Sequence, residues 1–274
     1  MIKVDLHTHT KHSHAMASVQ EMFDSGQKAG LEIHGFSEHS PRPLGFDYPS
    51  DYREKLQAGF PSYVAEVQGL AEKHKDECTV LLGLELDWLP SQLDFAKATV
   101  AQYDYDYIIA GIHFLDTWGF DFTPDDWAAL SDTALADIYT RYFSTVEAMA
   151  ESGLFQILAH PDIIKLFSVD KFHAWLTNAD AQKIVRRSFE AVKAADVAIE
   201  ISSAGLRKPC KEIYSCPTIM QIAVDLEIPI TFGSDAHCVN TMAWGFDQLE
   251  AYARRFGYTE SAYFTKKQRH FKKF

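Results

Sequence analysis

Short apolar runs alternate along the chain with longer segments whose apolar residues recur at helical spacing. Seven of the short runs are rich in β-branched and aromatic residues, which is typical of buried strands. We therefore predict strands over residues 2–6, 31–37, 79–85, 107–112, 155–159, 197–202 and 229–234.

Helices are predicted between these strands. Ser18 and Glu21 have the spacing of a capping box, and Gly30 marks the end of the helix that they open. Ser91 and Asp94 predict a second helix that opens in the same way. Longer helical segments are predicted over about 133–151, 180–195 and 217–227.

This alternation is typical of a parallel α/β sheet, because the crossover between parallel strands usually contains a helix. Seven strand–helix units favour a barrel over an open sheet. No linker interrupts the pattern, so we predict a single domain over residues 1–274.

Composition excludes several classes of protein. The apolar runs are too short to span a bilayer, which needs about 20 residues, and the N-terminus lacks the features of a signal peptide. Four cysteines without CxxC spacing predict reduced thiols in a cytoplasmic protein. The net charge of −12 argues against nucleic acid as a partner, and the basic run KKQRHFKK at 266–273 is predicted to be a solvated tail. No heptad pattern is present, so the oligomeric state stays open.

Metal-ligand side chains gather where the predicted strands end. Random placement of the 12 histidines would put about 1.5 in the five-residue windows at these ends. Six histidines occur there instead, and carboxylates end the third strand and follow the seventh: His7, His9, His39, His113, His160, His237, Glu85 and Asp235. Because the carboxyl ends of parallel strands converge on one face, we expect these side chains to lie together.

The chemistry of this set indicates a catalytic metal site. The imidazoles of His7 and His9, two residues apart on an extended backbone, point to the same side. Imidazole and carboxylate suit Zn, Fe or Mn, and a carboxylate such as Glu85 can bridge two ions about 3.5–4 Å apart. The alternative for HxH alone is a polar strand end. Asp5 is predicted to orient an imidazole, and His34 to be a packed core histidine.

Several segments, in order along the chain, resemble motifs of the PHP (polymerase and histidinol phosphatase) family: DLHTHT, SEHSP, GLE, GIHF, AHPD and GSDAH. Within that family, GIHFLDTWGFD, EISSAGLRKPCKEIYSCP and ITFGSDAH are similar to the histidinol-phosphate phosphatases. The resemblance implies an irregular TIM-like (β/α)7 barrel with two to three divalent metal ions at the carboxyl ends of its strands.

The resemblance also implies a distribution of ligands. The first ion is expected on His7, His9, Glu85 and Asp235, and the second on Glu85, His113 and His160. The third is expected on His14, His39 and His237. His12 is the alternative to His14, which is preferred because HAM resembles the family segment that carries this ligand.

The expected reaction is hydrolysis of L-histidinol phosphate to L-histidinol and phosphate in histidine biosynthesis. Glu85, Asp235 and Arg207 are predicted to act in catalysis, through a hydroxide that bridges the metals. Arg207 is expected to grip the phosphate, with Lys208 and Arg42 as further substrate contacts.

Charge supports a small substrate. Three divalent ions and two carboxylates leave the pocket positive by about four charges within an acidic protein, which favours a small phosphate monoester over a polyanion. The substrate's ammonium needs an acidic neighbour, for which Asp47, Asp87 and Asp116 are candidates.

Two alternatives remain open at this stage. One is a phosphoesterase for another small ester, a nucleotide or phosphotyrosine, and the other is a metal-binding PHP module without catalytic activity.

Overall fold

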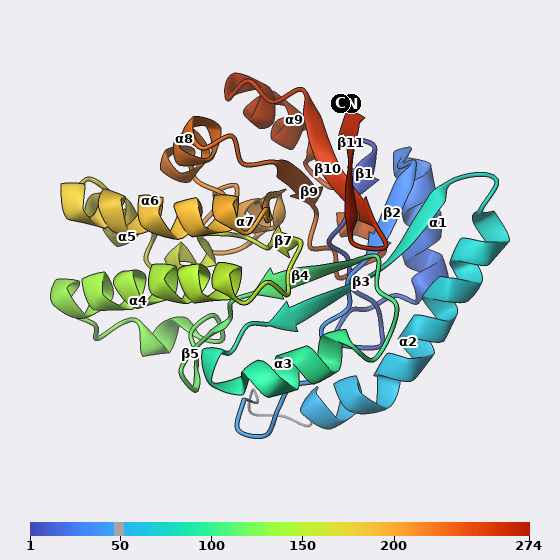
Figure 1. The fold of residues 1–274 in the computed structure, drawn as a ribbon, viewed down its shortest axis with the longest axis horizontal. Coiled ribbons are helices and arrows are strands. Elements are labelled where there is room, and N and C mark those ends of the chain that lie inside the picture. The colour runs from blue at the N-terminus through green and yellow to red at the C-terminus, as the bar shows by residue number, and fades with distance from the viewer. Residues whose placement is uncertain (47–51) are drawn as a thin grey trace.

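The seven predicted strands are all present and pair side by side as one parallel sheet in a computed structural model that describes residues 1–46 and 52–274. In spatial order they are β1 (Val4–Asp5), β2 (Ile33–Phe36), β3 (Thr79–Asp87), β4 (Tyr107–Gly111), β7 (Ile157–Leu158), β8 (Ala198–Ser202) and β9 (Ile230–Gly233). The first and last strands meet, because the Leu6 amide donates to the Phe232 carbonyl at 3.1 Å. The sheet is a nearly closed barrel surrounded by helices, which confirms the predicted fold (Figure 1).

Helices follow the strands and cover the outside of the barrel. They are α1 (Val19–Ala29), α2 (Tyr52–His74), α3 (Leu93–Val100), α4 (Asp132–Glu151), α5 (Val169–Leu176), α6 (Ala179–Ala194), α7 (Ala204–Arg207), α8 (Pro217–Asp225) and α9 (Phe246–Arg255). Single 3₁₀ turns are η1 (Pro90–Gln92), η2 (Pro124–Asp126), η3 (Ile163–Lys165) and η4 (Val239–Thr241). Within the described ranges, no helix is both long enough and apolar enough to cross a membrane.

The predicted helix signals were right at α1 and wrong at α3. Ser18 and Glu21 form the capping box, and Gly30 ends α1 in the left-handed conformation at φ 81°. Ser91 lies inside the turn η1 instead, and the residue that precedes α3 is Gln92, whose side chain makes no capping bond. Pro90 explains the difference, because its fixed φ opens a tight turn one residue before Ser91.

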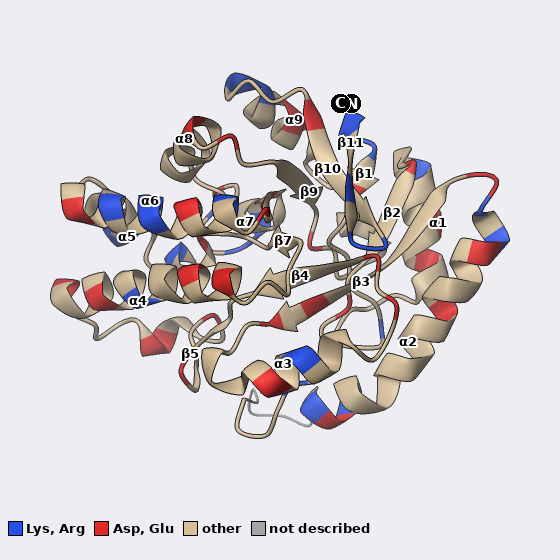
Figure 2. Cartoon of the chain, in the orientation of Figure 1, with Lys and Arg blue, Asp and Glu red and all other residues tan. Residues whose placement is uncertain are grey.

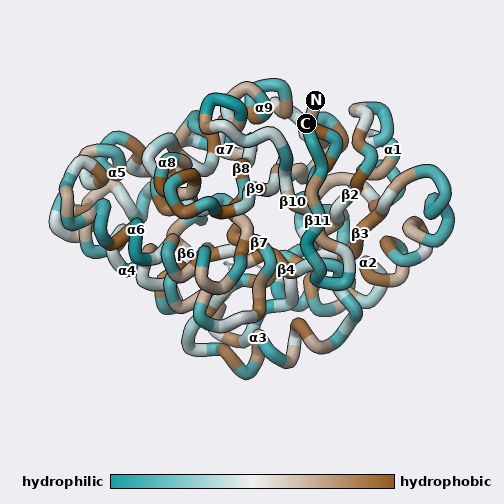
Figure 3. The backbone as a smooth tube through the Cα atoms, turned by 45° about the horizontal axis from the view of Figure 1, so that its top comes forward, coloured by the Kyte–Doolittle hydropathy of each residue, from teal (hydrophilic) through white to brown (hydrophobic). Residues whose placement is uncertain are grey.

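The inward-facing side chains of β3 and β8 are apolar near the start of each strand and polar near its end. Inside the barrel, apolar side chains such as Leu81 and Ala198 pack together near the start of β3 and β8. Four and two residues further on, the same inward side presents Glu85 and Glu200, because side chains on a strand repeat every second residue. A larger core fills the space between barrel and helices, and hydrophobic segments concentrate in the central strands (Figure 3).

The basic C-terminal segment is a strand and not a solvated tail, which corrects the prediction. β10 (Glu260–Thr265) and β11 (Gln268–Lys273) form an antiparallel hairpin. Phe264 packs with the apolar residues inside the barrel, so the hairpin is anchored there. Lys272 and Arg269 pair with Glu32 and Asp196 at 2.5 and 2.6 Å. Figure 2 shows basic residues of β11 near acidic ones, and both signs interspersed along α6.

Candidate metal centre

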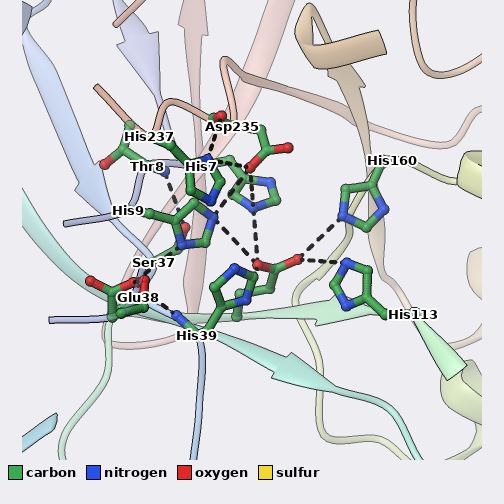
Figure 4. A network of polar contacts seen from close by, with 12 residues as sticks. His7, Thr8, His9, Ser37, Glu38, His39, His113, His160, Asp235 and His237 are labelled. Carbon is green, nitrogen blue, oxygen red and sulfur yellow. Dashed lines mark hydrogen bonds and ion pairs between the residues drawn. The ribbon is translucent and has the colours of Figure 1, made fainter. Parts of the chain in front are cut away.

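The side chains predicted at the strand ends converge on one buried cluster (Figure 4). His7 and His9 follow β1, and both are fully buried. Their Nε2 atoms lie 3.3 and 3.4 Å from Glu85 Oε2. Asp235, which follows β9, places its Oδ1 atom 3.3 Å from His9 Nε2 and 3.8 Å from His7 Nε2. Two imidazoles and two carboxylates thus face one another.

The other oxygen of Glu85 faces a second group. Glu85 Oε1 lies 3.2 Å from His160 Nε2 and 3.6 Å from His113 Nε2. The carboxylate at the end of β3 therefore stands between two sets of imidazoles, one on each oxygen. This is the arrangement expected of a carboxylate that bridges two cations.

A third group of imidazoles stacks beside the first. His9, His39 and His237 have ligand atoms within 4.8 Å of one another. The His14 ring lies 4.3 Å from the His237 ring, and its Nδ1 atom is 2.7 Å from the Tyr52 hydroxyl. The structure thus brings His14 to the edge of the third group, but the compact triple contains His9 in its place.

His12, the alternative to His14, lies elsewhere. Its Nε2 atom is 3.1 Å from Glu66 on α2, and its ring packs beside Tyr63. Of the two histidines in KHSHA, only His14 adjoins the cluster.

Buried carboxylates hold the outer nitrogens of three of these imidazoles. His7 Nδ1 lies 2.8 Å from Glu200, His9 Nδ1 3.3 Å from Glu38 and His113 Nδ1 2.6 Å from Asp87. An acceptor at Nδ1 fixes the tautomer that turns the Nε2 lone pair inward.

The prediction that Asp5 orients an imidazole is wrong. Asp5 accepts instead from the backbone amides of His7, Ser234 and Ala243, at 3.3, 3.0 and 3.3 Å. Glu200 has the orienting role and was missed, although a lone glutamate in the apolar run VAIEIS was a usable signal. His34 is a buried, packed histidine 4.8 Å from the Phe23 ring, as predicted.

The field of the carboxylates favours positive charge at His7 and His9, whose pKa values are raised. Burial lowers the pKa of His9, but the nearby carboxylates of Asp235 and Glu38 outweigh this effect and raise the pKa to about 9. Burial raises the pKa of Glu85, but the charges of His39 and His7 hold it well below the usual range. The same field that favours a proton on these imidazoles favours a metal cation in its place.

Unpartnered atoms test whether the residues fit metal ions. His7 Nε2, His9 Nε2, His237 Nε2 and Glu85 Oε2 are buried and have no partner in hydrogen-bond geometry. Such atoms are costly to bury unless something binds them. All four point into the cluster, and their types are those that Zn, Fe and Mn accept. The residues therefore fit divalent metal ions.

The three predicted phosphate contacts differ in position. Lys208 and Arg42 line a cavity of about 210 Å3 over the cluster, and Lys208 Nζ lies 2.9 Å from Asp235. The Arg42 guanidinium is buried between the Tyr52 and Phe114 rings, 5.2 Å from each. Its Nε atom donates to Asp87 at 2.5 Å.

Arg207 lies outside the cavity lining. It donates instead to the carbonyls of Ser234 and Asp235, at 2.7 and 3.2 Å. Asp235 has a φ of 48°, which is unusual for a residue with a side chain. Arg207 therefore holds the strained turn that presents Asp235 to the cluster.

Three aspartates were predicted as possible partners of the substrate's ammonium group, and neither of the two that the structure describes lines the cavity. Asp87 is buried and paired with Arg42 and His113, so its charge is already compensated. Asp116 pairs with Arg141 and its side chain is 84% exposed. Asp47 lies outside the described residues. Beside the histidine and carboxylate cluster, the acid that lines the cavity is Asp121, which was not predicted from the sequence.

A profile of the PHP domain matches residues 5–204, more than half of the sequence. The chain belongs to the PHP family. A probable histidinol-phosphatase of Deinococcus radiodurans is 33% identical to this PHP protein over 235 residues, or 85% of each chain. The histidinol-phosphatase of Bacillus subtilis is 23% identical over 265 residues, which cover 90% of this chain and 98% of the relative.

The PHP fold is also found in a solved structure. Histidinol phosphate phosphatase of Lactococcus lactis, complexed with zinc, L-histidinol and phosphate, superposes with a TM-score of 0.75 over 98% of both chains. Its sequence is 17% identical, so this comparison concerns the fold. The match to the PHP family and the curated relatives confirm the predicted family and the predicted enzyme class, a phosphoric monoester hydrolase.

Proposed function

We propose that this protein is a metal-dependent phosphatase that hydrolyses L-histidinol phosphate to L-histidinol and phosphate, as a single domain over residues 1–274. The observation that carries the proposal is the position of Glu85, whose two oxygens face separate imidazole groups at 3.2–3.4 Å. Relatives named histidinol-phosphatase, which match along most of their length, support the choice of substrate.

Two to three divalent ions, Zn, Fe or Mn, would be held by the clustered side chains. We assign the first to His7, His9, Glu85 and Asp235, the second to Glu85, His113 and His160, and the third to His14, His39 and His237. His9 adjoins both the first and the third group. When bound, the ions would supply Lewis acidity toward the phosphate oxygens and lower the pKa of an attacking water.

The protein's own side chains bind and orient the ester. Lys208 and Arg42 line the cavity and would compensate the charge of the phosphate. When Asp235 binds a metal ion, it would give up its ion pair with Lys208. The ammonium group of Lys208 would then be available to bind the phosphate of the substrate. Arg207, predicted as a phosphate contact, is assigned here to positioning the Asp235 turn.

The cavity favours a phosphatase of small esters. A volume of about 210 Å3 suits a small phosphomonoester, and turnover of a nucleotide or of phosphotyrosine is decided by the assay below. Lys208 and Arg42, both at the cavity, argue against a metal-binding module without catalysis.

Phosphate release tests the function. The purified protein is assayed with L-histidinol phosphate, nucleoside monophosphates and phosphotyrosine at equal concentrations, before chelation, after chelation and after metal add-back. We expect preferential turnover of L-histidinol phosphate, loss on chelation and recovery with metal.

A pair of variants separates the site from the fold. Glu85→Gln should reduce turnover by at least about 1000-fold, because it removes the shared carboxylate charge. Glu66→Gln, on the outer helix α2, is the matched control and should retain activity. Faster turnover of a nucleotide, or no turnover with any metal, would refute the proposal.

A further inference from the structure

Two residues that line the cavity have no part in the proposed chemistry. Among the described residues, the lining outside the histidine and carboxylate cluster consists of Arg42, Tyr52, Lys208, Asp121 and Phe122, and Tyr52 contacts His14 of the cluster. Arg42 and Lys208 suit the phosphate. Asp121 and Phe122 are adjacent in sequence, and they bring an acid and an aromatic ring to the same edge.

The backbone on either side fixes this pair in place. A short hairpin of β5 (Phe114–Leu115) and β6 (Trp118–Gly119) leads into Phe120, which is fully buried. The Phe120 amide donates to the His113 carbonyl at 3.2 Å, and its carbonyl accepts from Trp127 Nε1 at 2.8 Å. The next two residues are therefore held beside His113, at the cavity edge.

The negative charge of Asp121 is unfavourable for a phosphate alone. Its negative charge acts on both His113 and Lys208, two residues that line the same cavity. A carboxylate at this position disfavours a bare phosphate dianion by like-charge repulsion. The Asp121 carboxylate favours binding when the alcohol part of the substrate carries a positive group that faces this carboxylate.

The ring supplies a second feature. Phe122 is 54% exposed, and among the described residues that line the cavity it is the one with a purely hydrocarbon side chain. A phenylalanine ring offers a flat apolar face to an aromatic group of a ligand, and such contacts contribute about 0.5–1.5 kcal/mol beyond burial.

We propose that Asp121 and Phe122 select the alcohol part of the substrate: Asp121 accepts a hydrogen bond from its ammonium group, and Phe122 packs against its flat ring. The pair thus specifies phosphate esters of aromatic amino alcohols. The inference rests on the proposed function, because L-histidinol carries both groups.

Four esters separate the two contacts. L-histidinol phosphate has an ammonium and a ring, phosphoethanolamine only the ammonium, p-nitrophenyl phosphate only the ring, and glycerol 2-phosphate neither. A hydrogen bond to a charged group contributes about 1.5–3 kcal/mol, which corresponds to a factor of about 10–100.

Asp121→Asn should lower kcat/KM by that factor for the two ammonium esters, and by less than about 3-fold for the other two. Phe122→Ala should lower it about 3- to 10-fold for the two ring esters only. Asp116→Asn, an exposed aspartate on the same hairpin, is the matched control and should leave all four unchanged.

Binding gives a readout that is independent of turnover. Calorimetry with L-histidinol and the metal-loaded protein should show a Kd about 10–100-fold weaker for Asp121→Asn, at unchanged metal content. An equal loss on all four esters, or no loss on either ammonium ester, would overturn the inference. If the wild type hydrolyses phosphoethanolamine but not L-histidinol phosphate, while Asp121→Asn weakens only the former, the proposed function fails and the ammonium contact stands.

Discussion

Replacing Glu200 by Gln tests whether the buried carboxylates behind the imidazoles set the metal affinity. Glu200 is 1% exposed and accepts from His7 Nδ1 at 2.8 Å and from the His160 amide at 2.7 Å. Gln has the same shape, but its amide NH2 is a donor. It can therefore favour the tautomer of His7 that carries the proton on Nε2, the atom that faces Glu85.

The expected size of the effect follows from these contacts. Removal of a carboxylate that holds a metal-ligating imidazole typically lowers metal affinity about 10–100-fold, or about 1.4–2.8 kcal/mol. The carbonyl oxygen of Gln can still accept from the His160 amide, so the ion on His7 should be the one that binds more weakly. Zinc affinity is measured by competition with a chromophoric chelator, and activity at saturating zinc should largely recover.

The control is Glu147→Gln, which removes a carboxylate on α4 that pairs with Arg187 at the surface. It should bind zinc as the wild type does. Unchanged zinc affinity in Glu200→Gln would refute the claim that this carboxylate orients His7. A large loss of thermal stability in the metal-free variant would show that Glu200 is needed for folding.

Three further predictions address close packing, phosphate contact and pH. Gly233→Ala should weaken metal binding and lower the free energy of unfolding in urea by about 1–3 kcal/mol, because its Cβ would clash with Glu200 Oε1. Gly69→Ala is the control and should not destabilise the protein, because its Cβ would meet nothing within 4 Å. Lys208→Ala should raise the KM of the ester about 10-fold at unchanged metal content, and an unchanged KM would exclude the phosphate contact. Burial lowers the pKa of His34 to about 4. The unfolded chain therefore binds a proton at this residue more tightly than the folded protein does, and stability that is present above pH 6.5 is lost as the pH falls toward 4. Between pH 7 and 4.5, metal-free His34→Gln should lose about 2–3 kcal/mol less than the wild type, and equal losses would contradict this.

The strands, and the histidines and carboxylates at their ends, could be predicted because both are encoded locally. Each strand is a short apolar run. His7, His113 and Asp235 each follow the end of a different strand by two residues. Parallel topology alone then brings the strand ends to one face. Nothing about side-chain conformation is needed for this step.

The partners of these side chains depend on register between distant strands and were predicted less well. Glu200 contacts His7 across 193 positions of sequence, and it looked like one polar residue in a core strand. Asp5 is near His7 in sequence but binds backbone amides of another loop. Asp121 reaches the cavity only because a hairpin folds back after β4.

The C-terminal hairpin illustrates the limit of composition. KKQRHFKK is basic enough to read as a solvated segment, and its alternate residues are indeed exposed. Its structure comes from the preceding strand, in which Ala262 and Phe264 pack with the barrel interior. Tertiary packing therefore determines a strand that charge alone argues against.

A crystal structure of the metal-loaded protein, with the ions located and identified by anomalous scattering, tests the central claim most directly. We predict at least two ions about 3.5–4 Å apart with Glu85 between them, one on His7 and His9 and the other on His113 and His160. A single ion, or ions bound elsewhere with Glu85 in contact with none, would contradict it.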